Sequence, residues 1–225
     1  MDREKLLMEM FTAMQEALGT SEWWPAESSF EIMVGAVLTQ NTNWKNVEKA
    51  INNLRDAGLL SAQAIHDLPQ DTLAALIRPA GYYNVKAKRL QNLLRWFKEA
   101  SDFSFSDLDF MDTPALRAEL ISVNGIGHET ADSILLYAFK RPSFVVDAYT
   151  RRIFNRHGLI DESIYYEDLR DYFMDVLVED AAFFNEYHAL IVRVAKKWCL
   201  KNKQLCETCP LCRFLDNPPC HRDEG

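Results

Sequence analysis

The five cysteines of this 225-residue chain all lie beyond position 198, with the spacing Cys199-x6-Cys206-x2-Cys209-x2-Cys212-x7-Cys220. Thiolates at such short spacings can converge on a metal centre, because several soft ligands must lie within a few ångströms of one another. The odd number of cysteines, and their absence from the rest of the chain, argue against a disulfide framework. The sequence therefore predicts a metal site, in a reducing compartment.

A second chemical feature is the glycine turn Gly125-Ile126-Gly127, which stands between two short predicted helices. Glycines tolerate positive φ and let another backbone approach closely. Backbone N–H groups at such a turn can form a small concavity that binds an anion such as a DNA phosphate, with no basic side chain. The same pattern is also typical of an ordinary helix–helix turn. Asp147 lies twenty residues beyond Gly127 and is placed to cap the next predicted helix.

The elements that must position these groups are all predicted to be helices. Apolar residues recur at helical spacing almost throughout, and Asp112-Thr113-Pro114 is a strong helix start. We expect about ten helices and an all-α fold. The helical segments are residues 6–14, 30–40, 47–54, 71–77, 85–97, 112–123, 128–139, 147–157, 167–178 and 182–198.

Composition fits a soluble globular protein, with 48% hydrophobic residues and a net charge of −8. The longest apolar run, Ile32 to Leu38, is too short to span a bilayer, and no signal peptide is evident, so an intracellular protein is expected. An acidic chain can still bind nucleic acid through a segregated basic face. Each basic cluster is either such a face or an ordinary solvated one. The clusters are Lys86, Lys88 and Arg89; Arg151 and Arg152; and Arg193, Lys196, Lys197, Lys201 and Lys203.

The ordered motifs resemble those of the helix-hairpin-helix DNA glycosylases of the endonuclease III superfamily. The matching segments are GAVLTQNT (Gly35 to Thr42), GYYNVKAKRL (Gly81 to Leu90), VNGIGHETADSILLYAF (Val123 to Phe139), VVDAYTRRIF (Val145 to Phe154) and the cysteine tail. The resemblance covers nearly the whole chain. It implies two helical domains flanking a DNA-binding cleft: a six-helix domain at residues 29–141, and a discontinuous domain at residues 1–28 and 142–225.

The resemblance also assigns catalytic positions. Asp147 stands where the superfamily has its catalytic aspartate, and a carboxylate can stabilise the positive sugar that forms when an N-glycosidic bond breaks, or activate water. Glu129 stands where bifunctional members carry a lysine that forms a Schiff base. A carboxylate cannot form one, so no lyase activity is expected. Glu129 also suits the first turn of any helix.

Aromatic residues suggest the lesion. Trp23, Trp24, Pro25 and Trp44 resemble the pocket of the 3-methyladenine DNA glycosylase type, since an indole face attracts a cationic alkylpurine; they could equally be core aromatics. Gln40 matches the residue that fills the gap left by a flipped nucleotide, although a polar residue at a helix end is also ordinary.

The cysteine tail resembles the superfamily's [4Fe–4S] loop, with Cys199, Cys206 and Cys209 as three ligands. The usual fourth position is occupied by Leu215, so either Cys220, which we favour, or Cys212 must serve. Lys201 and Lys203 would then face DNA phosphates.

The leading hypothesis is a monofunctional DNA glycosylase in base excision repair that removes a flipped alkylated purine, such as 3-methyladenine, from double-stranded DNA. Alternatives are a mismatch or damaged-pyrimidine glycosylase, and a DNA-structure-binding protein without catalysis. A monomer without membrane contact is expected.

Overall fold

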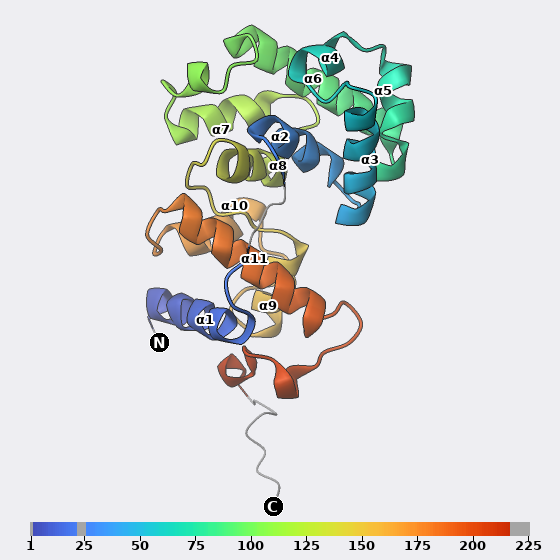
Figure 1. The fold of residues 1–225 in the computed structure, drawn as a ribbon. Helices are drawn as coiled ribbons and strands as arrows, with labels where there is room; N and C mark the ends of the chain where they lie inside the picture. The colour runs from blue at the N-terminus through green and yellow to red at the C-terminus, as the bar shows by residue number, and fades with distance from the viewer. Residues whose placement is uncertain (1, 22–25, 217–225) are drawn as a thin grey trace, which may run out of the picture. The chain divides into compact units, whose positions relative to one another are not determined.

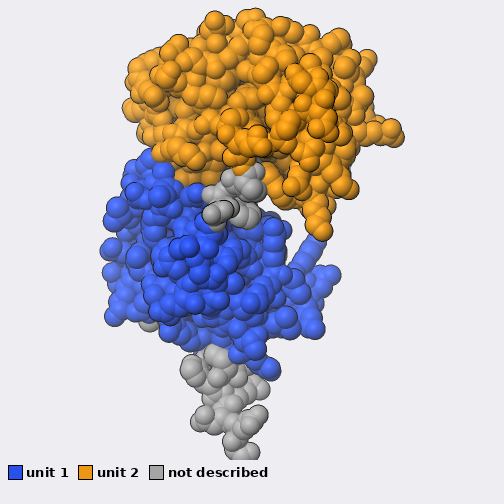
Figure 2. All heavy atoms as spheres, in the orientation of Figure 1, with its two compact units in different colours: residues 1–23, 142–225 blue, residues 24–141 orange. Residues whose placement is uncertain are grey.

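A computed structural model describes residues 2–21 and 26–216 of the chain. The chain divides into two compact units, Met1–Trp23 with Pro142–Gly225 (unit 1), and Trp24–Arg141 (unit 2), which Figure 2 distinguishes by colour. The first division falls at 23/24, whereas the sequence placed it at 28/29. Within the described residues the regular structure is helical, and the β-type pairing is one isolated bridge between Cys199 and Gln204. The predicted all-α class is confirmed.

Unit 2 is built around one buried helix. Its elements are α2 (Ser29–Leu38), α3 (Trp44–Asp56), α4 (Ala62–Asp67), α5 (Gln70–Leu76), α6 (Tyr83–Ser101), α7 (Thr113–Ser122), α8 (His128–Ser133) and the π-helical turn η3 (Ile134–Ala138). Helix α2 packs against α3, α6, α8 and η3 (Figure 1), and every residue from Glu31 to Leu38 is buried. A helix covered on all sides needs apolar residues all round, which explains the run Ile32 to Leu38. Gln40 follows directly after its end.

Side-chain caps fix where several of these helices begin. Ser28, Asn43, Ser61 and Asp112 each accept a hydrogen bond from the backbone N–H three residues further on, at the starts of α2, α3, α4 and α7. Each cap satisfies a backbone donor that has no intrahelical partner. For α7 the cap and Pro114 in the first turn agree with the sequence prediction.

Two features of unit 2 differ from the prediction. Helix α4 was not expected, because it is short and buries one residue, Ile65, so its sequence carries no apolar stripe. The predicted single helix 128–139 is instead α8 followed by the π-helical turn. All residues from Thr130 to Ala138 are buried, and an all-buried segment shows no periodicity that could separate the two helix types.

Unit 1 contains α1 (Arg3–Leu18), α9 (Ala148–Arg156), α10 (Tyr166–Met174), α11 (Ala181–Lys197) and the short turns η4 (Cys206–Thr208) and η5 (Cys212–Phe214). Helix α11 packs against both α1 and α9 (Figure 1). The core is aromatic: the rings of Phe144 and Phe173 stack with centroids 4.0 Å apart, and Phe184 and Tyr187 of α11 meet Phe144 edge-on. Such contacts add to the stabilisation from burial.

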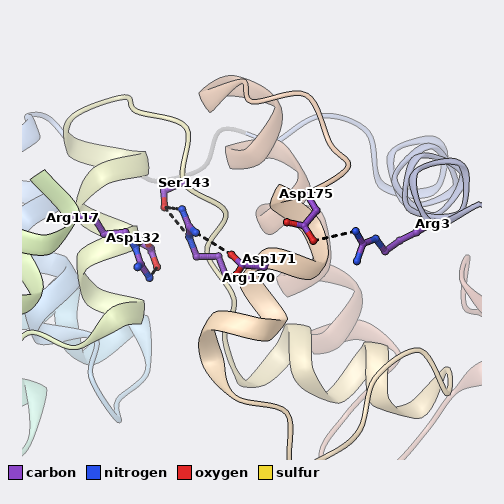
Figure 3. A network of polar contacts seen from close by, with 7 residues as sticks. All are labelled: Arg3, Arg117, Asp132, Ser143, Arg170, Asp171 and Asp175. Carbon is purple, nitrogen blue, oxygen red and sulfur yellow. Dashed lines mark hydrogen bonds and ion pairs between the residues drawn. The ribbon is translucent and has the colours of Figure 1, made fainter. Parts of the chain in front are cut away.

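Polar contacts fix the extended segment that leads to Asp147. The Arg170 guanidinium on α10 donates to Oγ of buried Ser143, 3.3 Å away (Figure 3). A separate ion pair of 3.2 Å joins Arg3 of α1 to Asp175, directly after α10 (Figure 3). Val145 and Val146 are buried as well. The backbone immediately before Asp147 is therefore held by both packing and a hydrogen bond. No described helix is at once long and apolar enough to cross a membrane.

Candidate functional site

The glycine turn of unit 2 is held by a buried ion pair. Asp132 of α8 is fully buried, and its carboxylate accepts two hydrogen bonds from Arg117 of α7, at 2.7 and 2.9 Å (Figure 3). This bidentate pair fixes the register of α7 against α8. The intervening turn, Val123 to Gly127, buries the side chain of Ile126 and leaves Gly127 and His128 exposed. The turn is therefore a rigid hairpin with its second glycine facing outward.

The two glycines of this turn play different parts. Gly125 has φ +99°, and a Cβ there would lie only 2.3 Å from Cγ of Arg89. Gly127 has φ −94°, which any residue adopts, and a Cβ there would meet nothing within 4 Å. Positive φ is therefore needed at Gly125 and not at Gly127. Open space beside Gly127 still allows another molecule to approach the backbone closely.

Gln40 lies against this hairpin. Its Nε2 donates to the backbone oxygen of Gly125 at 3.2 Å and to Oγ1 of Thr130 at 2.9 Å. Its Oε1 accepts a hydrogen bond of 2.6 Å from Nη1 of Arg89 on α6. The structure thus joins two predicted DNA-binding features, Gln40 and the glycine turn, and adds Arg89, which the sequence had placed in an undifferentiated basic cluster.

The structure removes Lys86 from the predicted basic cluster of Lys86, Lys88 and Arg89. Its side chain is buried, with 1% exposure, and Nζ donates to the backbone oxygens of Leu38 and Ala80, both at 2.7 Å. Burial, together with the nearby charge of Arg89, lowers the pKa of Lys86 to about 8. Lys86 is therefore a structural tie from α6 to the end of α2, not a solvated or phosphate-binding residue.

Asp147 of unit 1 begins α9 as the predicted cap. Its Oδ1 accepts from the backbone N–H groups of Tyr149 (2.9 Å) and Thr150 (2.8 Å) and from Oγ1 of Thr150 (3.1 Å). Its Oδ2 lies 3.5 Å from Nε2 of His188 on α11. The side chain is 13% exposed. The three donors thus hold one oxygen and fix the orientation of the other.

The electrostatics keep this carboxyl ionised. Burial alone would raise the pKa of Asp147, but the hydrogen bond and charge of His188 and the hydrogen bonds from Thr150 hold that pKa below its ordinary value. Sequence reasoning missed His188, because a histidine in the middle of an apolar helix gives no sign of the carboxylate it faces.

The remaining predicted residues of the catalytic and base-binding sets are placed as follows. Glu129 is exposed in the first turn of α8. Trp44 is the first residue of α3 and is half-buried. Trp23, Trp24 and Pro25 lie outside the described residues.

Four cysteines of the tail line one cavity in unit 1. Cys199, Cys206, Cys209 and Cys212 line a cavity of about 70 Å³, together with apolar residues that include Ile153, Val194, Trp198 and Leu211. Cys199, Cys206 and Cys209 are free thiols, whereas Cys212 is disulfide-bonded. Cys220 lies outside the described residues. The disulfide departs from the expectation of metal-held thiolates, and cysteines gathered around one cavity oxidise readily unless a metal holds them as thiolates.

The cavity presents soft sulfur donors, which either zinc or an iron–sulfur cluster requires. Among residues 2–21 and 26–216 no group of three or more histidine, cysteine, aspartate or glutamate side chains is arranged around one metal position. Zinc needs four donors within about 2.3 Å of one point. In a [4Fe–4S] cluster each cysteine binds a different iron, so the sulfurs stand further apart around a central volume. The donor set and the apolar wall therefore suit the cluster.

Arginines hold the cysteine loop in place. Nε of Arg152 donates to the backbone oxygen of Cys199 at 2.8 Å, and Arg156 donates to those of Leu200 (2.8 Å) and Lys201 (2.9 Å). Nη1 of Arg156 also lies 3.1 Å from Sγ of Cys199. Arg152, which the sequence grouped with surface residues, is thus structural.

Arg193, which the sequence placed in the third basic cluster, donates instead to the backbone oxygens of Leu18 and Gly19 at the end of α1. The side chains of Lys201 and Lys203 are exposed.

Residues 34–178 match the HhH-GPD superfamily of base excision DNA repair proteins. The chain is 48% identical over 215 residues to a Methanocaldococcus jannaschii protein whose name proposes a DNA repair glycosylase, covering 93% of this chain and 96% of that one. The chain belongs to the HhH-GPD superfamily, and it is a DNA glycosylase of that family.

Two further similarities come from different branches of glycosylase. Endonuclease III of Sulfolobus acidocaldarius is 30% identical over 196 residues, covering 84% of this chain and 83% of that protein. The solved structure of the H. pylori 3-methyladenine DNA glycosylase bound to 1,N6-ethenoadenine has a TM-score of 0.74 and 28% identity, covering 88% of this chain and 98% of that one. The predicted resemblance to the endonuclease III superfamily is confirmed.

Proposed function

We propose that this protein is a monofunctional glycosylase that hydrolyses the N-glycosidic bond of an alkylated purine, such as 3-methyladenine, flipped out of double-stranded DNA. The observation that carries the proposal is the geometry of Asp147. One carboxylate oxygen is fixed by three donors, and the other faces His188.

The chemistry of the step follows from that carboxylate. When the bond between base and sugar breaks, positive charge develops on the deoxyribose. A pre-oriented carboxylate stabilises that charge without reorganising, and the same oxygen can take a proton from the attacking water. The depressed pKa of Asp147 means that it is ionised at neutral pH, as both roles require.

Glu129 supports hydrolysis without strand cleavage. It occupies the position two residues beyond Gly127 and is exposed in the first turn of α8. A Schiff base with the sugar requires an amine nucleophile, which a carboxylate does not provide. We therefore infer that the product is an intact strand with an abasic site.

The alkylpurine specificity rests on aromatic side chains and on one similarity. Trp23, Trp24 and Trp44 are indoles that would stack on an extruded base, with Pro25 beside the first two in the sequence, and a ring-alkylated purine carries positive charge that an indole face attracts. The H. pylori enzyme, whose name gives it 3-methyladenine, was solved with a modified adenine. Endonuclease III of Sulfolobus acidocaldarius is about equally similar to this chain, so a damaged-pyrimidine or mismatch substrate is the alternative that the assay must test.

DNA binding is assigned to the hairpin and to the cysteine loop. Gly127 gives open access to the turn backbone, where N–H groups can bind a phosphate. Gln40 lies against the same turn and would fill the gap left by the flipped nucleotide. Lys201 and Lys203 are exposed and can meet further phosphates.

We further propose a [4Fe–4S] cluster held by Cys199, Cys206, Cys209 and a fourth cysteine. Cys220 is our first choice, and Cys212 is the alternative once its disulfide is reduced. The cluster, when bound, fixes the fold of the loop around it. Within this chain, Arg152 and Arg156 hold the loop's carbonyl oxygens, so that Lys201 and Lys203 are displayed from a defined backbone.

The deciding experiment is a base-release assay on matched duplexes. One duplex carries 3-methyladenine, and the others carry G·T, G·U or an oxidised pyrimidine. We expect release from the alkylated duplex, strands that break only after alkali, and no adduct trapped by borohydride. Release confined to the pyrimidine or mismatch duplexes would favour the alternative, and an adduct trapped in good yield would refute the monofunctional assignment.

A further inference from the structure

Arg89, which lies beside the hairpin, has N–H donors that make no hydrogen bond within the described residues. A guanidinium carries five N–H donors. Among the described residues, the Arg89 guanidinium donates to Oε1 of Gln40, at 2.6 Å, and no described carboxylate pairs with its charge. Arg117, in contrast, is committed to buried Asp132, and Arg141 to backbone oxygens. Arg89 is therefore a half-buried cation whose remaining donors face no protein acceptor in residues 2–21 and 26–216.

The position of this cation is built, not incidental. The aliphatic part of Arg89 lies directly on Gly125: a Cβ there would be 2.3 Å from Cγ, 3.0 Å from Cδ and 3.1 Å from Cβ of Arg89. Its head group is fixed by Gln40. A long flexible side chain is thus held at both its stem and its tip, which lowers the entropy lost when it binds a ligand.

Gln40 itself has little left to offer a ligand. Both N–H groups of its amide are engaged, with Gly125 and Thr130, and its oxygen accepts from Arg89. An amide has two donors, so a further donation would require one of these bonds to break. Polar contact with DNA at this point therefore falls to Arg89, with Gln40 as the residue that positions it.

We propose that Arg89 contacts DNA at the hairpin, donating hydrogen bonds to acceptor oxygens or nitrogens. The inference rests on the proposed function, because it needs duplex DNA at this face. Two acceptors share this chemistry: a backbone phosphate and the edge of a base. Arginine suits either, since its planar fork can donate two parallel bonds.

The test compares Arg89→Gln with Arg95→Gln. Arg95 lies on the same helix, is exposed, and makes one 3.4 Å bond to neighbouring Asn92, so its loss removes the same charge and no direct contact with the hairpin. Binding is measured by fluorescence anisotropy on duplexes that carry an abasic analogue opposite each of the four bases, at several salt concentrations. We expect Arg89→Gln to weaken binding about 5- to 100-fold, as for loss of a direct DNA contact, and Arg95→Gln to weaken it less than about 3-fold.

Two readouts separate the acceptors. A phosphate contact predicts equal weakening opposite all four bases and a salt slope smaller by about 1, with much of the affinity kept in Arg89→Lys. A base contact predicts unequal weakening, with Arg89→Lys failing like Arg89→Gln. Either pattern supports the inference.

Equal binding by Arg89→Gln and Arg95→Gln would overturn the inference, as would an Arg89→Gln variant that melts earlier yet binds normally. If the parent still excises its substrate in that case, only the role of Arg89 fails. A parent that binds no duplex would overturn the proposed function as well.

Discussion

Replacing Gly125 with alanine should destabilise unit 2, while the same change at Gly127 should not. At Gly125 the backbone has φ +99°, which costs an alanine about 1–2 kcal/mol. The new Cβ would also lie 2.3 Å from Cγ of Arg89 and 3.1 Å from its Cβ, so rotation of the side chain's far end cannot relieve the clash. Arg89 must shift and lose its bond to Gln40, at a cost of about 1–2 kcal/mol.

Together these costs predict a free energy of unfolding lower by about 2–4 kcal/mol, which lowers the Tm of a chain of this length by about 4–16 °C. Gly127→Ala is the matched control. Its φ of −94° suits alanine and no atom lies within 4 Å, so its Tm should stay within about 2 °C of the parent. Thermal unfolding followed by circular dichroism measures both.

Gly127→Ala should lose affinity for DNA even though its stability is normal. Gly127→Ala places a methyl group in the open space beside the turn, where we propose that a phosphate approaches, so its affinity for duplex DNA should fall despite its normal stability. Anisotropy measures this. The reasoning is refuted if Gly125→Ala is as stable as the parent, or if Gly127→Ala is destabilised as much as Gly125→Ala.

Three further results are expected. First, burial lowers the pKa of Lys86 from 10.5 to about 8, so between these pH values the unfolded chain binds more protons at this residue than the folded chain does. The free energy of unfolding of the parent relative to Lys86→Met should therefore be flat below pH 8 and rise up to about pH 10.5. A difference that falls with pH would contradict this. His188→Leu should move the acid limb of the pH–rate profile to higher pH, because His188 lowers the pKa of Asp147; an unmoved limb in a folded variant would exclude that influence. The purified protein should be brown, with absorbance near roughly 400 nm, and the colour should be lost in one of Cys220→Ser and Cys212→Ser but not the other, whereas a colourless protein with stoichiometric zinc would refute the cluster.

Local signals predicted the parts of the fold that depend on adjacent residues. Asp112 and Pro114 mark the start of α7, and Asp147 caps α9, because a cap and its partner lie three residues apart. The cysteine spacing likewise placed Cys199, Cys206 and Cys209 together, and they line one cavity.

Contacts between distant segments could not be predicted in this way. The buried side chain of Lys86 donates a hydrogen bond to the backbone oxygen of Leu38, which lies 48 residues away in the sequence. Its own sequence neighbourhood looks like an exposed basic patch. The union of Gln40, Arg89 and Gly125 depends equally on three segments meeting. The roles of such residues can be seen only in the folded structure, since a basic side chain next to other basic side chains in the sequence carries no local sign of burial.

The central claim is that Asp147 hydrolyses the bond to an alkylated purine, and single-turnover release of 3-methyladenine from duplex DNA tests it most directly. The comparison is between the parent, Asp147→Asn and the control Asp161→Asn, which changes an exposed turn aspartate bonded to Ser163. We predict that the parent and the control release the base at similar rates, and that Asp147→Asn binds the same DNA but releases base slower by a factor on the order of 10² or more. Release by Asp147→Asn at the parental rate, or no release by the parent, would contradict the account.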